Sequence, residues 1–288
     1  MLLALVAQSE NETNFRLAEA APRGVDVQIV RPAWTRGLLG PDDAALSRLD
    51  VLPTLDGIEP GICEVGRLEA EGIPVLNKLR ALLATHDKLQ TSRVLTGAGV
   101  PHPRTLHLVT AGEEVALDPP VVVKPRFGSW GQDVALCSDR RQLADTLEGL
   151  SERPWFRRQG VLVQELVAPL GHDLRIVVAA GGVVGAVRRR AADGEWRTNV
   201  ALGAERQTVA PPPQALELAL AAAAAADTDL VGIDLLPTRD GAWTVIELNG
   251  AVEFTDEYSL GRDVFSAAME GLVAAARAPE PRPLAALA

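Results

Sequence analysis

The feature that most constrains the fold of this chain is a predicted β-hairpin at residues 230–249. Its sequence, LVGIDLLPTRDGAWTVIELN, consists of two apolar runs separated by Asp240-Gly241. An Asp-Gly pair favours a two-residue turn, because both central residues of a type I′ turn need positive φ. With the turn placed there, Asp234 is predicted to lie opposite Glu247 on the neighbouring strand.

The same register predicts the other pairs of the hairpin. It places Leu236 opposite Val245 and Thr238 opposite Trp243. Side chains alternate between the two faces along a strand, so Asn249 is predicted to share the face of the two carboxylates.

The facing carboxylates predict a cation site. Two like charges directly opposite each other destabilise a sheet. Both acids have apolar neighbours and are expected to be partly buried, where such a pair persists if a cation neutralises it or one acid stays protonated. Two carboxylates and an amide oxygen suit Mg²⁺, which keeps positions open for phosphate oxygens. The alternative is a solvent-facing surface that carries two acids without a function.

A segment that could bind phosphate is predicted at residues 121–132. The apolar run Val121–Val123 ends in Lys124, and the glycine-rich stretch FGSWGQ follows shortly after. Glycines let backbone N–H groups approach phosphate oxygens closely. Neither a GxxxxGK[ST] nor a GxGxxG pattern occurs, so two common nucleotide-binding folds lose support. The alternative for Lys124 is a strand-end lysine that extends to solvent.

A second group of cations lies at residues 188–190, a run of three arginines, with Arg197 and Asn199 beyond an Asp-Gly turn. Alternate residues of a strand point to opposite faces, so at most two of the three arginines share a site. Arg197, Thr198 and Asn199 could each contact phosphate or substrate. The alternative is a solvated basic edge strand.

The composition limits the functions to be considered. The 288 residues carry a formal net charge of −10 and contain no long basic run, which argues against a nucleic-acid partner. Cys63 and Cys137 match no metal spacing, and a reducing cytoplasm is the expected compartment. The apolar start MLLALVAQ is short and lacks a cationic region, so it predicts a strand rather than a signal peptide. No membrane association is expected.

The order of elements predicts a fold of mixed α/β and α+β class. An α/β unit opens the chain, and antiparallel strands joined by short loops follow. The expected strands are residues 2–7, 25–30, 72–76, 105–109, 121–124, 134–137, 161–167, 174–179 and 183–189, besides the hairpin. The expected helices are residues 14–21, one capped by Thr85 that ends near Gly97, 139–150, 214–226 and 262–276. Residues 31–62 are ambiguous, and the Pro-rich end at 278–288 is predicted to be a frayed tail.

The order of these motifs resembles that of the RimK-type ATP-grasp ligases, which include the ligase that adds glutamate to a ribosomal protein. It is also similar to that of the LysX-type ligases of amino-group-carrier-dependent lysine and arginine biosynthesis. The resemblance covers roughly residues 75–265. The matching segments are Asp87-Lys88, VVVKP, the glycine loop, Gln164-Glu165-Leu166, Gly171–Arg175, Arg189, Trp196–Asn199, Gly232–Asp234 and Ile246–Asn249.

The resemblance implies nucleotide-binding roles by position. The residues concerned are Lys88, Lys124, Gly128, Ser129, Trp130, Gly131, Gln164, Glu165, Leu166, Asp173, Arg197, Thr198 and Asn199. Lys88 and Lys124 would contact the ATP phosphates, and Glu165 and Leu166 would line the adenine pocket. Asp173 would hold the ribose hydroxyls, and the glycine loop would form a lid over the triphosphate.

The resemblance also implies a metal site and a set of catalytic residues. Asp234, Glu247 and Asn249 would bind two Mg²⁺ or Mn²⁺ ions. The catalytic residues would be Arg189, Arg197 and Asn199.

A surplus of cations points to a further anionic substrate. The phosphates can use Lys88, Lys124 and Arg197, which leaves Arg175, Arg189 or Arg190 for another anion. Arginine binds carboxylates bidentately, so an acidic amino acid such as glutamate or aminoadipate is expected. Glu253 would hold or steer its amino group. The alternative is that these arginines only pair with acids of the protein.

The fold implied by the resemblance is the ATP-grasp fold in three parts. These are a small N-terminal α/β domain at residues 1–75, a central subdomain with the lid loop at 76–165, and a C-terminal α+β subdomain with the metal site at 166–288. The implied enzyme is a cytoplasmic ligase that forms an amide through an acyl phosphate. Its expected partners are ATP, the acidic amino acid and a carboxylate acceptor, either a small molecule or a small carrier protein. A homo-oligomer is compatible with the sequence.

The sequence departs from the family pattern in two places. The ribosomal-protein modifiers carry Pro-Gly-Leu after the metal asparagine, whereas this chain has Gly250–Phe254, closer to the LysX type. Ala251 replaces the threonine that is frequent there, which leaves the substrate open. Three alternatives remain: an ATP-grasp phosphotransferase, a ribosomal-protein-type glutamate ligase, and a non-catalytic nucleotide-binding relative, against which the intact acidic set counts.

Overall fold

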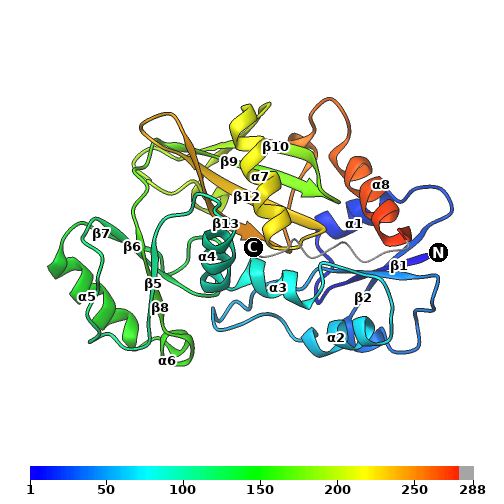
Figure 1. The fold of residues 1–288 in the computed structure, drawn as a ribbon, viewed down its shortest axis with the longest axis horizontal. Helices are drawn as coiled ribbons and strands as arrows, with labels where there is room; N and C mark the ends of the chain where they lie inside the picture. The colour runs from blue at the N-terminus through cyan, green and yellow to red at the C-terminus, as the bar shows by residue number, and fades with distance from the viewer. Residues whose placement is uncertain (279–288) are drawn as a thin grey trace.

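The computed structural model describes residues 1–278, which form three β-sheets with helices packed on them (Figure 1). The N-terminal elements are β1 (Leu2–Val6), α1 (Glu12–Glu19), β2 (Asp26–Val30), η1 (Pro32–Trp34), β3 (Ala44–Ser47), α2 (Ile62–Ala70) and β4 (Val75–Leu76). The strands form a parallel sheet in the order β2-β1-β3-β4. Its central strands β1 and β3 are apolar and almost entirely buried, as strands covered on both faces require. This confirms the predicted α/β opening.

The middle of the chain forms an antiparallel sheet in the order β5-β8-β6-β7. Its elements and the two preceding helices are α3 (Leu79–His86), α4 (Lys88–Gly97), β5 (Thr105–Leu108), β6 (Val121–Pro125), β7 (Ala135–Cys137), α5 (Arg140–Ser151), α6 (Pro154–Gln159) and β8 (Val161–Glu165). In Figure 1 this sheet, α5 and α6 form the lobe at the left.

The prediction that Thr85 caps a helix is wrong. Thr85 lies in the last turn of α3, where its hydroxyl donates to the carbonyl of Ala81 at 2.8 Å. The cap of α4 is Asp87, whose carboxylate accepts from the backbone N–H of Leu89 at 3.0 Å. A carboxylate at this position satisfies an otherwise unpaired helix donor and favours the positive end of the helix.

The C-terminal part contains a five-stranded antiparallel sheet in the order β11-β10-β9-β12-β13. Its elements are β9 (His172–Ala179), β10 (Gly182–Arg190), η2 (Val200–Leu202), β11 (Glu205–Thr208), α7 (Pro213–Ala225), β12 (Leu230–Pro237), β13 (Trp243–Asn249), η3 (Asp256–Tyr258) and α8 (Val264–Arg277). Alanines of α7 pack on one face of this sheet, and α8 packs on the other beside α1 (Figure 1).

The hairpin of β12 and β13 confirms one predicted pair and corrects two. Asp234 faces Glu247 as predicted, but Leu236 faces Thr244 and Pro237 faces Trp243. The turn is one residue longer than predicted, because Thr238 bonds to Ala242 and only Gly241 has positive φ. An irregularity between Asp234 and Leu235 compensates for that extra residue and restores the predicted pair of acids.

The first and third sheets share a hydrophobic core. Leu3 and Leu5 of β1 belong to the same buried cluster as Phe265 and Leu272 of α8, whereas the middle sheet has a cluster of its own. The predicted domain boundaries at 75 and 165 stay a prediction, since sheets alone do not show which parts fold independently. Among residues 1–278, no helix combines the length and apolarity needed to cross a bilayer. Of the predicted tail, residues 279–288 lie outside the described part.

Candidate active site

A cavity of about 970 Å³ lies between the middle sheet and the third sheet and is called the first cavity below. β6, β8 and the glycine loop contribute to one side of it, and β12 and β13 to the other. All thirteen residues predicted to bind the nucleotide line this cavity: Lys88, Lys124, Gly128, Ser129, Trp130, Gly131, Gln164, Glu165, Leu166, Asp173, Arg197, Thr198 and Asn199. The structure therefore brings together residues that are up to 111 positions apart in the sequence.

Lys124 points into a buried polar chain at one end of the first cavity. Its ammonium donates to the side-chain carbonyl of Gln164 at 2.8 Å, and the Gln164 amide donates to the hydroxyl of Thr105 at 2.8 Å. Burial lowers the pKa of Lys124 to about 8, although the charge of Glu247 opposes the shift. Burial likewise lowers the pKa of the nearby His102 to about 4. Lys124 is therefore a fixed and poorly hydrated cation, not a lysine that extends to solvent.

The glycine loop Gly128–Gly131 adopts backbone conformations that favour glycine. Gly128 and Gly131 have positive φ, and so does Trp130, which stays half exposed. The Lys88 ammonium donates to the carbonyl of Gly128, and the Arg197 guanidinium donates to the carbonyl of Gly131 at 3.1 Å. These two cations connect the loop to the far side of the first cavity, so the loop covers it.

A largely buried chain of alternating charges lies along the first cavity, which Asp173, Arg189 and Asp234 line. The Arg175 guanidinium donates to both carboxylate oxygens of Asp234, at 2.6 and 2.7 Å. Arg189 contacts Asp234 at 2.9 Å and also donates to both oxygens of Asp173. The hydroxyl of Thr198 donates to Asp173 at 2.5 Å. Burial opposes ionisation of Asp234, yet the two arginines together lower its pKa to about 2.

The three predicted metal ligands lie at the end of the hairpin. The Glu247 carboxylate forms an ion pair with Lys88 at 2.8 Å, and the Asn249 amide nitrogen donates to the carbonyl of Gly232 at 3.4 Å. This leaves the amide oxygen of Asn249 for a ligand. Asp234 is the least available of the three, because both of its oxygens already accept from arginine. Among residues 1–278, no three acidic, histidine or cysteine side chains cluster as a metal site by themselves.

These donors fit a divalent ion that takes only a few protein ligands. Carboxylate and amide oxygens are the ligand types that Mg²⁺ prefers, and it commonly binds through one or two carboxylates together with phosphate oxygens. Glu247 lines both the first cavity and a second, adjoining cavity that is described next. An ion bound to Glu247 could therefore contact phosphate in either cavity.

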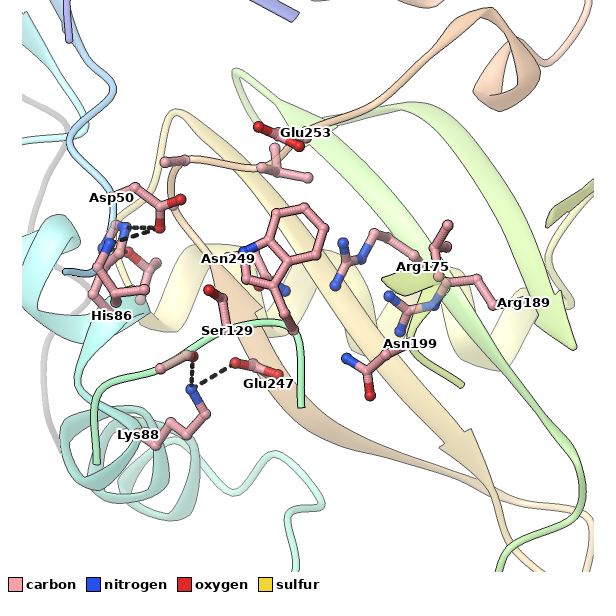
Figure 2. Close-up of a pocket in the computed structure, with 18 of the residues that line it drawn as sticks. Asp50, His86, Lys88, Ser129, Arg175, Arg189, Asn199, Glu247, Asn249 and Glu253 are labelled. Carbon is pink, nitrogen blue, oxygen red and sulfur yellow. Dashed lines mark hydrogen bonds and ion pairs between the residues drawn. The ribbon is translucent and has the colours of Figure 1, made fainter. Parts of the chain in front are cut away.

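A second cavity of about 850 Å³ adjoins the first (Figure 2). Lys88, Gly128–Trp130, Arg189, Asn199 and Glu247 line both cavities. Of the residues predicted to bind the substrate, Arg175 and Glu253 line the second cavity. Arg190 lines neither of the two cavities described, because strand alternation along β10 exposes it while Arg189 is buried.

Among the residues of the second cavity that were not predicted from the sequence are Asp50, His86 and Arg206. Arg206 on β11 contacts Glu257 at 3.3 Å, and its buried Nε has no hydrogen-bond partner. Asp50 lies in the segment whose sequence pattern was ambiguous, and His86 ends a helix that the sequence placed differently. Arg206 lies on an edge strand, where no sequence pattern distinguishes a binding arginine from a solvated one.

Comparison with known proteins places these features in a family. The model of the RimK-like ATP-grasp domain matches residues 85–267. The chain is 30% identical to the tetrahydromethanopterin:α-L-glutamate ligase of Methanosarcina acetivorans over 240 residues, 79% of this chain and 68% of that protein. It is 27% identical to a probable α-L-glutamate ligase of Alkalilimnicola ehrlichii over 284 residues, 91% of this chain and 92% of the relative.

A further relative shares only part of its length with the chain. The identity to mouse β-citrylglutamate synthase B is 32% over 195 residues, 65% of this chain and 49% of that protein, so the chain spans about half of it. Among solved structures, the RimK domain ATP-grasp protein of Sphaerobacter thermophilus superposes with a TM-score of 0.68 at 23% identity. The superposition covers 95% of this chain and all of that one, and it supports the ATP-grasp fold.

Proposed function

The chain belongs to the RimK-like ATP-grasp family, and we propose that it is an ATP-dependent ligase that joins a carboxylate to an amine. The observation that carries the proposal is the wall shared by the two cavities. Lys88, Glu247 and the glycine loop line both, so a carboxylate phosphorylated at the end of the first cavity would face an amine in the second. The reaction needs no side-chain nucleophile, because positioning and fixed charge do most of the work of phosphoryl transfer.

The proposed reaction has two steps. The terminal phosphoryl group of ATP is transferred to the carboxylate, giving an acyl phosphate and ADP. The amine then attacks the acyl carbon, the C–N bond forms as the C–O bond to phosphate breaks, and phosphate and a proton from the nitrogen are released. Lys88, Lys124 and Arg197 would hold the phosphates, and Asn199 at the shared wall would contact the acyl phosphate.

Asp234, Glu247 and Asn249 are proposed to hold Mg²⁺ or Mn²⁺, in two ions as the family pattern implies. Bound divalent ions would neutralise charge on the transferring phosphoryl group. Asp173 is better suited to hold Arg189 than to bind the ribose, because both of its oxygens already accept from Arg189. Glu165 and Leu166 remain the proposed adenine-lining residues, and Glu165 is exposed at the end of β8.

The proposed amine is an acidic amino acid. Two of the relatives are named as glutamate ligases. In this chain the arginine best placed to bind a carboxylate is Arg206, since Arg175 and Arg189 are engaged by Asp173 and Asp234. The carboxylate acceptor is proposed to be a small molecule or the end of a small carrier protein. Both cysteines are free thiols, in keeping with the proposed cytoplasmic location.

A panel of amino acids tests the proposed function. With ATP, Mg²⁺ and candidate carboxylates, phosphate release is expected to require an amino acid, and glutamate or aminoadipate should support it better than lysine or alanine. Phosphate release and the mass of the product are measured together. Turnover of ATP that needs no amine would instead indicate a phosphotransferase. Use of neutral or basic amino acids in place of acidic ones would contradict the proposed substrate class.

Replacing Lys124 with alanine is expected to weaken ATP binding about 10- to 100-fold, the loss of one charge-assisted hydrogen bond of about 1.5–3 kcal/mol. Because the pKa of Lys124 is lowered to about 8, its charge is present below that pH and lost above it. The affinity of the unchanged protein should therefore fall towards that of K124A as the pH rises from 7 to 9.5. Calorimetry with a non-hydrolysable ATP analogue and Mg²⁺ measures both effects. Equal affinities at pH 7 would remove Lys124 from the nucleotide site.

A further inference from the structure

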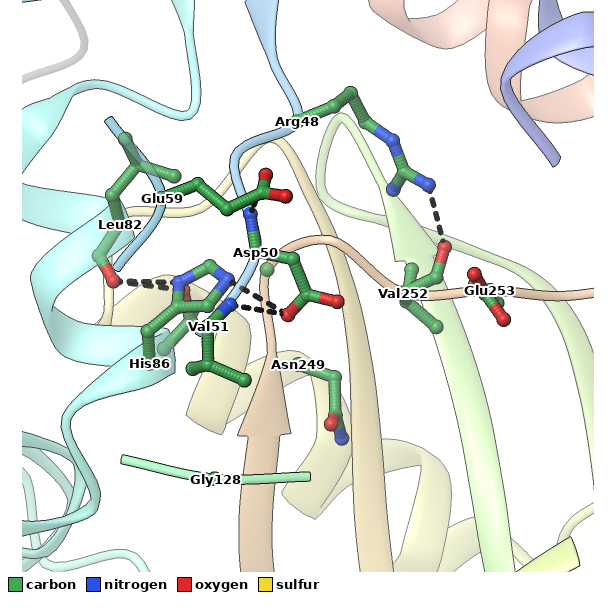
Figure 3. Close-up of polar contacts among 12 residues, drawn as sticks. Arg48, Asp50, Val51, Glu59, Leu82, His86, Gly128, Asn249, Val252 and Glu253 are labelled. Atoms are coloured by element: carbon green, nitrogen blue, oxygen red, sulfur yellow. Dashed lines mark hydrogen bonds and ion pairs between the residues drawn. The ribbon is translucent and has the colours of Figure 1, made fainter. Parts of the chain in front are cut away.

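The imidazole of His86 carries an unpaired nitrogen at the edge of the second cavity. Its Nδ1 lies 2.8 Å from the carbonyl of Leu82, which can only accept, so Nδ1 is the donor of this bond (Figure 3). In a neutral ring, Nε2 is then an acceptor. The residue is only 4% exposed, and its Nε2 is buried with no hydrogen-bond partner. Buried polar atoms nearly always have a hydrogen-bond partner, and the second cavity, which His86 lines, is where a bound molecule can supply one to Nε2.

The carboxylate of Asp50 is the polar group that faces this nitrogen. Asp50 Oδ1 lies 3.9 Å from His86 Nε2, which is too long for a hydrogen bond between them. The carboxylate is held in place because Oδ1 accepts from the backbone N–H of Val51 at 2.7 Å. The 3.9 Å between these two acceptors is slightly shorter than the roughly 4–5 Å spread of two N–H bonds on one ammonium nitrogen. An amino group on the cavity side of the pair can therefore reach both acceptors once they separate by a few tenths of an ångström.

The position of His86 in the Asp50–His86 pair depends on Gly250, which directly follows Asn249. A Cβ atom at Gly250 would lie 2.3 Å from the hydroxyl of Thr85 and 2.7 Å from His86 Cε1, closer than atoms can approach. Only glycine lets the end of β13 pack this closely on the end of α3. The pair therefore lies beside the proposed metal ligands, where the acyl carbon would be attacked.

Apart from Lys88 and Glu247, which pair with each other at 2.8 Å, the charges around the second cavity are arranged in two groups. Figure 2 shows Asp50 and His86 on one side, with Arg175 and Arg189 on the other. Arg206, which also lines this cavity, adds the guanidinium with the unpaired Nε. Behind the acidic side, the buried guanidinium of Arg48 donates to the carbonyl of Val252 at 2.9 Å and lies near the charges of Asp50 and Glu253. A molecule with an ammonium at one end and a carboxylate at the other matches this arrangement.

We propose that Asp50 and His86 bind the amino group of the amino-acid substrate. His86 accepts one N–H through Nε2, and the carboxylate of Asp50 accepts another and balances the charge. This inference rests on the proposed ligase function, since it locates the amine of that reaction. It assigns to Asp50 and His86 the role that the sequence suggested for Glu253, which is exposed and already accepts from Asn11 at 3.3 Å.

The test compares amino acids with their counterparts that lack the α-amino group. The full chain, with a non-hydrolysable ATP analogue and Mg²⁺, is titrated with L-glutamate and glutarate, with L-aspartate and succinate, and with L-lysine and 6-aminohexanoate. The unchanged protein should bind at least one amino acid about 10- to 100-fold more tightly than its counterpart, the range expected for a hydrogen bond to a charged group.

Two variants should lose this preference. D50N removes the negative charge, and H86N removes Nε2 while its amide can still donate to the carbonyl of Leu82. Both should bind the amino acid no better than its counterpart, with unchanged affinity for the ATP analogue. D42N, which removes an exposed carboxylate outside the second cavity, is the control for net charge and should keep the preference.

The outcomes separate this inference from the proposed function. The inference would be overturned if the unchanged protein showed no preference for the amino acid, or if D50N and H86N kept that preference. It would also be overturned if E253Q, which removes the charge of Glu253, lost the preference while D50N and H86N kept it. A failure of the ligase proposal appears elsewhere, as absence of amine-dependent phosphate release in the panel. If H86N alone lost affinity for the ATP analogue, that variant would be structurally disturbed. The preference for the amino acid in D50N would then be the test of the inference.

Discussion

Turnover is expected to fall at least about 10²–10³-fold when Glu247 is replaced by glutamine, the size of effect seen when one preorganised electrostatic contact to a transition state is lost. Glu247 lines both cavities, and its carboxylate is more available to a metal ion than that of Asp234, whose two oxygens already accept from Arg175. Glutamine keeps the shape but not the charge, so divalent-ion binding should weaken. The rate of phosphate release as a function of Mg²⁺ and Mn²⁺ concentration measures this loss.

The stability of E247Q separates a functional role from a structural one. Considered alone, two facing carboxylates repel, so removing one should leave the metal-free protein equally or more stable. In the structure, Asp234 is neutralised by Arg175 and Arg189, and Glu247 is paired with Lys88. The gain from relieved repulsion is therefore small and is offset by the lost ion pair, a change of at most about 1 kcal/mol.

E12Q is a suitable control for E247Q, because Glu12 lies in the first turn of α1, away from both cavities. Metal-free melting temperatures of both variants should lie within about 4 °C of that of the unchanged protein. A clear fall in melting temperature for E247Q with activity retained would show that Glu247 holds the hairpin together and does not bind the metal.

The hairpin shows how sequence reasoning reached a correct pair through an incorrect register. Counting outward from an assumed two-residue turn paired Asp234 with Glu247. In the structure the longer turn shifts the pairs by one, and the irregularity beside Asp234 shifts them back. Turn length and bulges depend on how side chains pack on both faces of a sheet, which local pattern does not contain. The predicted pair was correct because two deviations cancel.

The residues of the first cavity that were predicted to bind the nucleotide could be identified because they lie in short motifs that are recognisable in the sequence and follow one another in a known order. All thirteen residues predicted to bind the nucleotide belong to segments with a local pattern, such as the apolar run before Lys124 or the glycine loop after it. The second cavity is different. Asp50 follows a short strand inside a segment rich in proline and glycine, and Arg206 lies on an edge strand. Only the packing of the first sheet against the third brings these residues to the site.

The arginines illustrate a further limit of sequence reasoning. Charge counting left Arg175, Arg189 and Arg190 free to bind substrate. In the structure Arg175 is partly buried and pairs with Asp234. Arg189 is buried and pairs with Asp173 and Asp234, and Arg190 is exposed away from both cavities. A sequence gives the number of charges but not their pairing, and buried charges in a fold are almost always paired.

The largest effect on stability is expected from replacing Arg189 with methionine. Arg189 is 4% exposed and lies between two buried carboxylates. Removing one partner of a buried ion pair typically costs about 3–5 kcal/mol, because the remaining charge is left uncompensated. The melting temperature should fall by roughly 6–20 °C. R190M is the matched control, because the neighbouring side chain is exposed and its loss should change stability by no more than about 0.5 kcal/mol.

The pH dependence of R189M tests the cause of that loss. In the unchanged protein, burial opposes ionisation of Asp234, but Arg175 and Arg189 lower its pKa to about 2. A lowered pKa contributes stability that is complete above the ordinary value of about 4 and is lost as the pH falls towards 2. R189M should raise the pKa of Asp234. The difference in unfolding free energy between the unchanged protein and R189M should therefore be largest at pH 7 and should become smaller as the pH falls from 4 to 2.5. Urea unfolding at several pH values measures it. A difference independent of pH would indicate that the loss comes from packing of the side chain and not from its charge.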